Sequence, residues 1–153
     1  MGEAKAQSII EAEIRLRNIA STIKKNGRII LKKYNMTSPQ FVALQWISEA
    51  GTLTIGELSN KISLAFSTTT DLIDRLEKKG FVKRVQDVKD RRVVRIHILD
   101  KGKEIIKEVI AQRQEYLGDV LVDFSTEEIV HLNKVLFALD EQMKKVDAVN
   151  VNK

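Results

Sequence analysis

The chain has 153 residues, of which 43% are hydrophobic and 31% charged, with one proline and seven glycines. Such a length fits one compact domain, and the scarcity of helix-breaking residues favours long helices over an all-β fold. Because cysteine is absent, disulfides, thiolate zinc sites and thiol redox chemistry are excluded. The sequence has no apolar run of membrane-spanning length, and its first residues lack the apolar core of a signal peptide, so we expect a cytoplasmic protein without a membrane partner.

The net charge of +5 is unevenly distributed. Residues 75–95 carry nine basic and three acidic side chains, a net of +6, whereas residues 100–153 carry eight bases and eleven acids. One short segment therefore has the charge expected for binding a polyanion. A basic surface that is merely solvated is the alternative that a charge run alone leaves open.

In chain order, the first expected helix covers residues 8–33 and ends at Asn35–Met36. Apolar residues recur along it at spacings of three and four, namely Ile9, Ala12, Leu16, Ile19, Ile23 and Ile30. Thr37–Gln40 has a hydroxyl cap and a proline in the first turn, which predicts the start of a second helix that ends at Gly51. Its aromatic residues Phe41 and Trp46 are expected in the core, the alternative being that they line a small-molecule pocket. Residues 52–54 are expected to form a short strand.

Thr54–Glu57 is a capping box, which predicts a short third helix followed by a turn at Ser63–Leu64. A fourth helix is expected over about 65–79, ended by Gly80. One face of it is mostly apolar, with Ala65, Thr69, Leu72, Ile73 and Leu76. The opposite face is polar, with Ser67, Thr68, Thr70, Asp71, Asp74, Arg75 and Lys78. A short helix, a tight turn and a helix with a polar outer face are typical of a helix-turn-helix motif.

The periodicity then changes to two, which predicts strands over 81–85 and 93–99 that form a β-hairpin with a basic tip. A fifth helix is expected from Asp100, with apolar residues as far as Phe124. Ser125 or Thr126 caps the last helix, whose apolar residues from Ile129 to Val146 form an unbroken heptad seam. Residues 150–153 are expected to be disordered. The fold class is therefore mainly α (α+β): a winged helix-turn-helix flanked by long N- and C-terminal helices.

This arrangement predicts contacts with duplex DNA. A helix fits the major groove, where the hydroxyls of the fourth helix could reach bases, and Arg75 suits a phosphate. The hairpin arginines Arg91 and Arg92 could enter the minor groove, with Asp90 holding an arginine in orientation. Each feature alone is more typical of a solvated surface, but their order, with the charge confined to them, favours DNA.

Five segments closely resemble the MarR family of bacterial transcription regulators: 58–62, 67–70, 72–82, 90–92 and 99–102. The most specific are D-R-L-E-K-K-G at 74–80 and D-R-R at 90–92. The resemblance implies a single MarR-type domain over 1–153, with a winged-helix DNA-binding part at 37–99 and dimerisation helices at 8–33 and 100–147. It implies that Ser67, Thr68 and Thr70 lie in the major groove and that Arg91 and Arg92 reach the minor groove.

There are two departures from the family pattern. Asp71, which we keep among the candidate contacts, stands where the family often has a basic residue. Ala65 replaces the usual hydroxyl cap of the recognition helix.

The function expected from this resemblance is sequence-specific binding of double-stranded DNA by a homodimer, at a pseudo-palindromic operator. The protein is expected to repress a small operon and to be released by a small phenolic or anionic ligand. The heptad seams support dimerisation independently, although they could instead pack within one subunit.

No cofactor and no metal are expected. His97 and His131 stand apart, and the sequence contains no phosphate-binding or nucleophile motif, so an enzyme is not expected. The alternative function is a winged-helix protein-interaction module without specific DNA binding. Such a module would need an exposed apolar face on the fourth helix.

Overall fold

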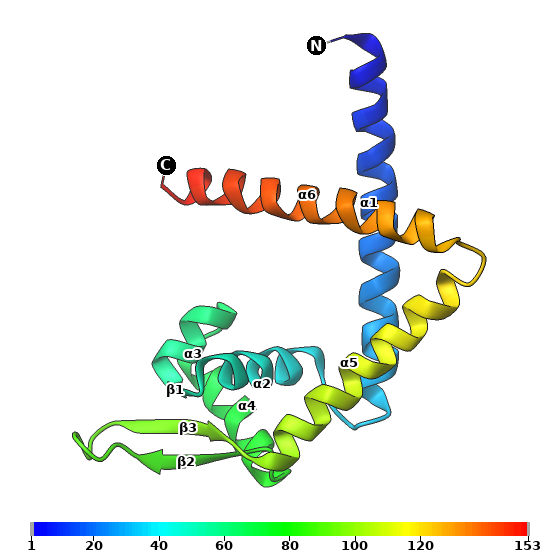
Figure 1. Cartoon of the computed structure of the whole chain (residues 1–153). Coiled ribbons are helices and arrows are strands. Elements are labelled where there is room, and N and C mark those ends of the chain that lie inside the picture. The colour runs from blue at the N-terminus through cyan, green and yellow to red at the C-terminus, as the bar shows by residue number, and fades with distance from the viewer. Residues whose placement is uncertain (1, 153) are drawn as a thin grey trace. The chain divides into compact units, whose positions relative to one another are not determined.

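The computed structural model describes residues 2–152, which contain six helices and three strands. The chain divides into two compact units, residues 1–113 and 114–153, which are described separately below. In chain order (Figure 1) the elements are α1 (Glu3–Lys32), α2 (Ser38–Ala50), β1 (Thr52–Thr54), α3 (Ile55–Ile62), α4 (Phe66–Lys78), β2 (Val82–Gln86), β3 (Val94–Ile98), α5 (Asp100–Val120) and α6 (Thr126–Val151). The prediction of a mainly helical winged helix-turn-helix fold is confirmed.

Helix α1 begins five residues before the predicted start at residue 8, because residues 3–7 are mostly good helix formers. It ends where Asn35 adopts a left-handed conformation (φ 53°) that turns the chain into α2. Thr37 and Gln40 form the predicted cap of α2: the Thr37 hydroxyl accepts from the Gln40 N–H, and the Gln40 side chain accepts from the Thr37 N–H. The two helices are thereby joined by a tight connection.

The three strands form an antiparallel sheet in the order β1-β3-β2, so the last strand in sequence lies in the centre. Ile96 of β3 pairs with Leu53 of β1 on one side and with Arg84 of β2 on the other. The predicted hairpin is confirmed, but β2 lies one residue later than the predicted strand 81–85, and β3 is one residue shorter at each end than the predicted strand 93–99. Phe81 and Leu99 instead bond to each other across the end of the sheet.

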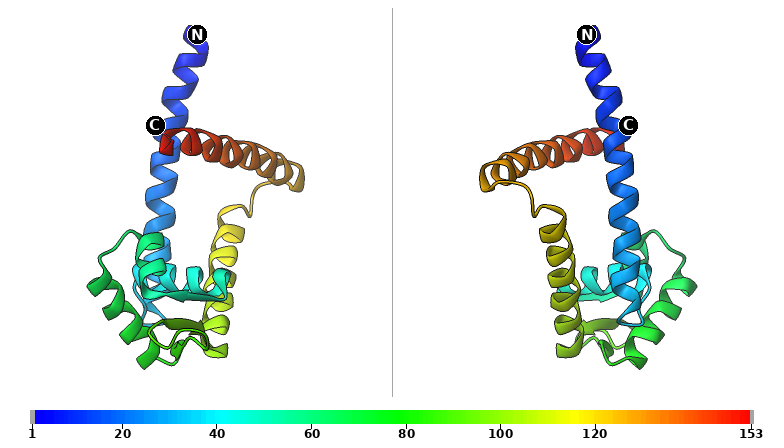
Figure 2. Two further views of the ribbon diagram at one scale, coloured as in Figure 1. Left: turned by 90° about the vertical axis from the view of Figure 1, so that its left-hand side faces the viewer. Right: turned by 90° about the vertical axis from the view of Figure 1, so that its right-hand side faces the viewer.

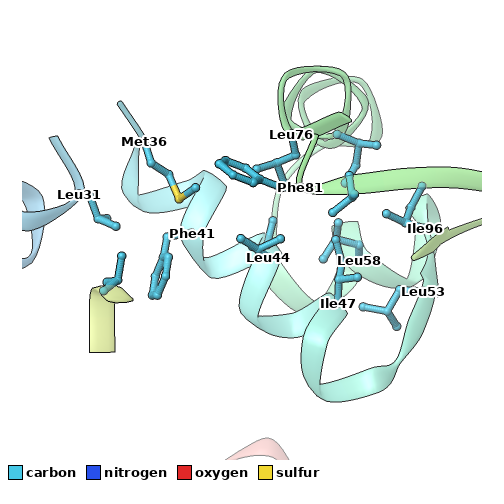
Figure 3. Packing of buried hydrophobic residues seen from close by; sticks show 14 of the residues in the cluster. Leu31, Met36, Phe41, Leu44, Ile47, Leu53, Leu58, Leu76, Phe81 and Ile96 are labelled. Carbon is cyan, nitrogen blue, oxygen red and sulfur yellow. The ribbon is translucent and has the colours of Figure 1, made fainter. Parts of the chain in front are cut away.

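Helix α2 lies at the centre of the hydrophobic core (Figure 3). Its residues Phe41, Leu44 and Ile47 are almost fully buried. They pack with residues from every other element of unit 1, which include Leu31, Met36, Leu53, Leu58, Leu76, Phe81, Ile96 and Val109. Trp46 is partly buried and packs against the same cluster, as the sequence predicted. The helix-turn-helix and the wing therefore share one core.

In the second unit, the Ser125 hydroxyl caps α6 and Glu128 completes the box. Two predictions are wrong here. Helix α5 ends at Val120, so Phe124 lies in the following turn, where its N–H donates to the Leu121 carbonyl. Residues 150 and 151 are helical rather than disordered, since no proline or glycine interrupts α6; residue 153 lies outside the described residues. Within residues 2–152 we find no helix whose length and hydropathy would allow it to cross a membrane.

Candidate nucleic-acid interface

The helix-turn-helix consists of α3 and α4, joined by a three-residue turn. Thr54 and Glu57 form the predicted capping box at the start of α3. At its end Ser63 adopts a left-handed conformation (φ 55°), and the Leu64 N–H donates to the Ser59 carbonyl. This turn closes α3 and sets the direction in which α4 leaves it.

Helix α4 is anchored to the core by one face. Thr69, Ile73 and Leu76 are fully buried, and the Thr69 hydroxyl donates to the Ala65 carbonyl at 3.0 Å, so its polar group is satisfied inside the helix. The predicted outer face is exposed, with Ser67, Thr68, Asp71, Asp74, Arg75 and Lys78. Seven residues were predicted to contact DNA. The structure places five of them on this one helix, namely Ser67, Thr68, Asp71, Arg75 and the partly buried Thr70.

The start of α4 departs from the expectation at Ala65 and exposes one aromatic residue for which the sequence pattern made no prediction. Ala65 was predicted on the core face but is exposed, because it precedes the first helical turn and makes no side-chain cap. Phe66 is 62% exposed, and the sequence pattern assigned it to neither face. Thr70 is partly buried, and its hydroxyl donates to the Phe66 carbonyl at 3.0 Å. That hydroxyl can therefore only accept a hydrogen bond from a ligand while this bond is kept.

The wing is the β2–β3 hairpin with its tip at residues 87–93 (Figure 1 and Figure 2). Figure 1 shows that the tip extends away from α4. At the tip, Asp90 accepts hydrogen bonds from both the N–H and the guanidinium of Arg92, each at 3.1 Å. The bond to the Arg92 side chain is the main cause that lowers the pKa of Asp90. The Arg92 side chain remains 90% exposed, so the carboxylate orients the guanidinium without burying it.

The base of the wing is held by a second ion pair. Arg95 on β3 donates to Asp87 at 3.2 Å, and its guanidinium also reaches the Thr52 hydroxyl of β1 at 3.5 Å. Asp87 accepts from the Lys89 N–H as well, and this bond is the largest of the causes that lower its pKa. Side-chain contacts of Arg95 thus hold the base of the hairpin against β1, in addition to the backbone hydrogen bonds of the sheet.

Arg84 on β2 forms a link that the sequence analysis missed. Its guanidinium pairs with Glu77 at 2.7 Å and with Asp74, both on α4. The sequence analysis counts Arg84 among the nine bases of segment 75–95, but in the structure Asp74 and Glu77 already neutralise its charge. Of the nine bases in that segment, three are paired in the described part of the chain: Arg84, Arg92 and Arg95. The bases without an ion pair there are Arg75, Lys78, Lys79, Lys83, Lys89 and Arg91.

The MarR family model matches residues 36–94 of this chain, which cover α2, the helix-turn-helix, β2 and the wing tip and end at the first residue of β3. The HTH-type transcriptional regulator YsmB of Bacillus subtilis (strain 168) is 54% identical over 139 residues, which cover 91% of this chain and 95% of YsmB. A MarR family protein of Bacillus stearothermophilus, of known structure, is 52% identical with a TM-score of 0.81, over 94% of this chain and 99% of that one.

The transcriptional regulator Tm0710 of Thermotoga maritima is 33% identical with a TM-score of 0.77, over 90% of this chain and 97% of that one. Both sequence and fold therefore match along nearly the whole chain, well beyond the winged-helix segment. The chain belongs to the MarR family of helix-turn-helix transcription regulators.

Proposed function

We propose that this protein is a homodimeric repressor that binds a pseudo-palindromic site on duplex DNA, with α4 in the major groove and the wing in the adjacent minor groove. The observation that carries the proposal is the exposed polar face of α4, bounded by a wing whose tip presents two arginines. A protein-interaction module is disfavoured, because this face is polar from Ser67 to Lys78.

The chemistry of α4 suits the major groove. Ser67 and Thr68 are exposed in the first turns, and short hydroxyls there can donate to or accept from base edges. Arg75 lies two turns further along the same face, where a guanidinium suits a phosphate. Asp71 is exposed between them and could accept from the amino group of a cytosine, so this departure from the family pattern is compatible with base recognition.

The chemistry of the wing suits the minor groove. Arg91 and Arg92 are exposed, and narrow minor grooves concentrate negative potential that attracts arginine. Asp90 fixes the direction of the Arg92 guanidinium before DNA arrives. Because fewer rotamers must then be frozen on binding, this ion pair lowers the entropic cost of the contact.

Dimerisation is supported by apolar surface that a single chain leaves exposed. Helix α1 exposes Ile9, Ile10, Ile14, Leu16, Ile19, Ile23 and Ile29. Helix α6 buries none of its residues and exposes Val130, Val135, Leu136, Phe137, Met143 and Val146. Faces this apolar are expected to be covered, and a second copy of the chain would also double the DNA-binding surface.

Repression follows if the dimer occupies the operator and excludes other proteins from it. Release by a small phenolic or anionic ligand requires the ligand to prefer a form of the dimer that does not fit the operator. Deletion of the gene should raise expression from the promoter whose DNA the protein binds, and reduced expression would identify an activator.

The decisive experiment selects duplexes from a random-sequence library with the full-length protein and then titrates the recovered site by fluorescence anisotropy. If the dimer neutralises about six phosphates, log K should fall with log salt with a slope of about −5 between roughly 50 and 200 mM. The recovered sites should contain two half-sites about one helical turn apart. Failure to enrich any sequence, or an affinity that salt does not change, would refute the proposal.

A further inference from the structure

The first turn of α4 lies outside the hydrophobic core. Residues 63–68 are all exposed, whichever side of the helix they lie on, and burial begins only at Thr69. Phe66 precedes Thr69 and Ile73 by three and seven residues, which is the spacing of the buried face, yet Phe66 is 62% exposed. The core therefore ends before Phe66, and the first turn of α4 extends beyond it.

Residues 63–68, which we call the α4 tip, carry no charge. Their side chains are either apolar or hydroxyl-bearing, and the nearest ionisable residues are Lys61 before the tip and Asp71 after it. The exposed cations of α4, Arg75 and Lys78, lie near its other end. Phosphates are held by cations, whereas hydroxyl and apolar groups are suited to base edges. The composition of the tip therefore favours contact with bases over contact with the backbone.

Phe66 is the one aromatic side chain at this tip. A phenylalanine can bury at most about 150–250 Å², which is far below the roughly 800 Å² per partner of a stable protein interface. Its neighbours Ser67 and Thr68 are exposed and polar, so they do not extend the apolar surface. In helix-turn-helix proteins the N-terminal residues of the recognition helix reach the base edges. The apolar group that those edges offer in the major groove is the 5-methyl group of thymine.

We infer that Phe66 is a specificity-determining residue that packs on the 5-methyl group of one thymine in each half-site. This inference rests on the proposed function, in which α4 enters the major groove. It adds a preference that Ser67 and Thr68 do not provide, because a hydroxyl can donate or accept and so pairs with several bases. The Phe66 ring gains a contact only where a methyl group replaces water against it.

The test starts from the duplex that the protein selects and replaces its thymines by deoxyuridine, one position at a time and in both half-sites together. Deoxyuridine lacks only the 5-methyl group, so base pairing and the minor groove are unchanged. At one position this replacement should weaken binding to the parent by about tenfold, from three- to fourfold for each buried methyl group. Phe66→Ala should bind the thymine and deoxyuridine duplexes equally, and no more tightly than the parent binds the deoxyuridine duplex.

Two further variants serve as controls. Phe66→Leu keeps an apolar side chain at the tip and should retain part of the difference between thymine and deoxyuridine. Val88→Ala removes a 97% exposed apolar side chain from the wing tip and should retain the whole difference, because the methyl groups lie in the major groove. Thermal unfolding checks the fold of Phe66→Ala, which should melt no lower than the parent, since the lost side chain is exposed and alanine is the better helix former.

The outcomes separate this inference from the proposed function. If no deoxyuridine replacement changes the affinity of the parent, the inference is overturned and the proposed function stands, even if Phe66→Ala weakens all duplexes through a lost contact with the sugars. A tenfold difference that persists in Phe66→Ala also overturns it, because another residue must then contact the methyl group. Failure to select any duplex would instead refute the proposed function, and this inference with it.

Discussion

Both the backbone N–H and the guanidinium of Arg84 bond to the carboxylate of Glu77, at 2.8 and 2.7 Å. The wing strand β2 is thereby attached to the recognition helix α4 outside the hydrophobic core. Asp74, one turn earlier on α4, accepts from the same guanidinium. Since α4 and the wing are proposed to enter adjacent grooves of one duplex, their relative orientation has to be fixed, and Arg84 contributes to fixing it.

Arg84→Gln should lower the free energy of unfolding by about 1–2 kcal/mol, because a charge-assisted and partly buried contact is lost. A double-mutant cycle with Glu77→Gln should give a coupling energy of at least about 0.5 kcal/mol in urea titrations. Lys83→Gln is the control, since it removes the same charge from the exposed neighbouring position of β2. A coupling energy near zero would mean that the pair makes no net contribution.

Gly102→Ala should destabilise the winged-helix unit. A Cβ at position 102 would clash with the Phe81 carbonyl oxygen and would lie 2.9 Å from Cγ1 of Ile98. The start of α5 would have to move away from the sheet, at a cost of about 1–3 kcal/mol. Gly56→Ala, also in a helix, meets only an ordinary contact with the Thr54 hydroxyl at 4.0 Å and should be neutral or stabilising. Thermal unfolding of both variants checks this, and equal melting temperatures would contradict it.

The two proposed reading elements should respond differently to mutation. Arg92→Ala should weaken binding to all duplexes, most of all to sites with A·T-rich flanks. Ser67→Ala should instead relax discrimination at one or two base positions by about 1–3 kcal/mol, with non-specific affinity nearly unchanged. Arg15→Ala, on the exposed N-terminal part of α1, serves as the control. If Arg92→Ala binds selected and scrambled duplexes like the parent, the wing does not contact DNA.

Leu136→Asp should dissociate the proposed dimer. Leu136 is 47% exposed in the single chain, and a carboxylate in an apolar interface would be desolvated without a partner. Ala138→Asp introduces the same charge at an exposed position on the opposite side of α6 and should leave the dimer intact. Sedimentation equilibrium distinguishes the two variants, and an intact Leu136→Asp dimer would locate the interface elsewhere.

Acid should loosen the wing through Asp87. Hydrogen bonds from the Lys89 N–H and then Arg95 lower the pKa of Asp87 in the folded state. A depressed folded pKa gives stability that is fully present above the unfolded pKa of about 3.9 and is lost as the pH falls through the lower folded value. The melting temperature of the parent should therefore exceed that of Asp87→Asn at pH 6, and the difference should shrink below about pH 4. A difference that is independent of pH would rule out this role for the carboxylate.

The helices and the hairpin could be predicted because their signals are local. The capping residues Thr37, Thr54 and Ser125 mark the starts of three helices in the sequence itself. The end of α5 was missed, because apolar spacing continues through Phe124 although the helix stops at Val120. The Arg84 link depends on residues brought together only by the tertiary fold. Composition counts Arg84 and Arg75 alike, yet one is neutralised by two carboxylates and the other is exposed without an ion pair in the described chain.

The sheet order has a consequence for how the polypeptide folds during synthesis. Strands β1 and β2 do not pair with each other; each pairs only with β3, which follows β1 by some forty residues. Until residue 98 leaves the ribosome, β1 has no strand to bond, and the core lacks Ile96, which is fully buried in the finished sheet. The strand that completes the wing also completes the core, so the wing forms in the same cooperative step as the body that carries it.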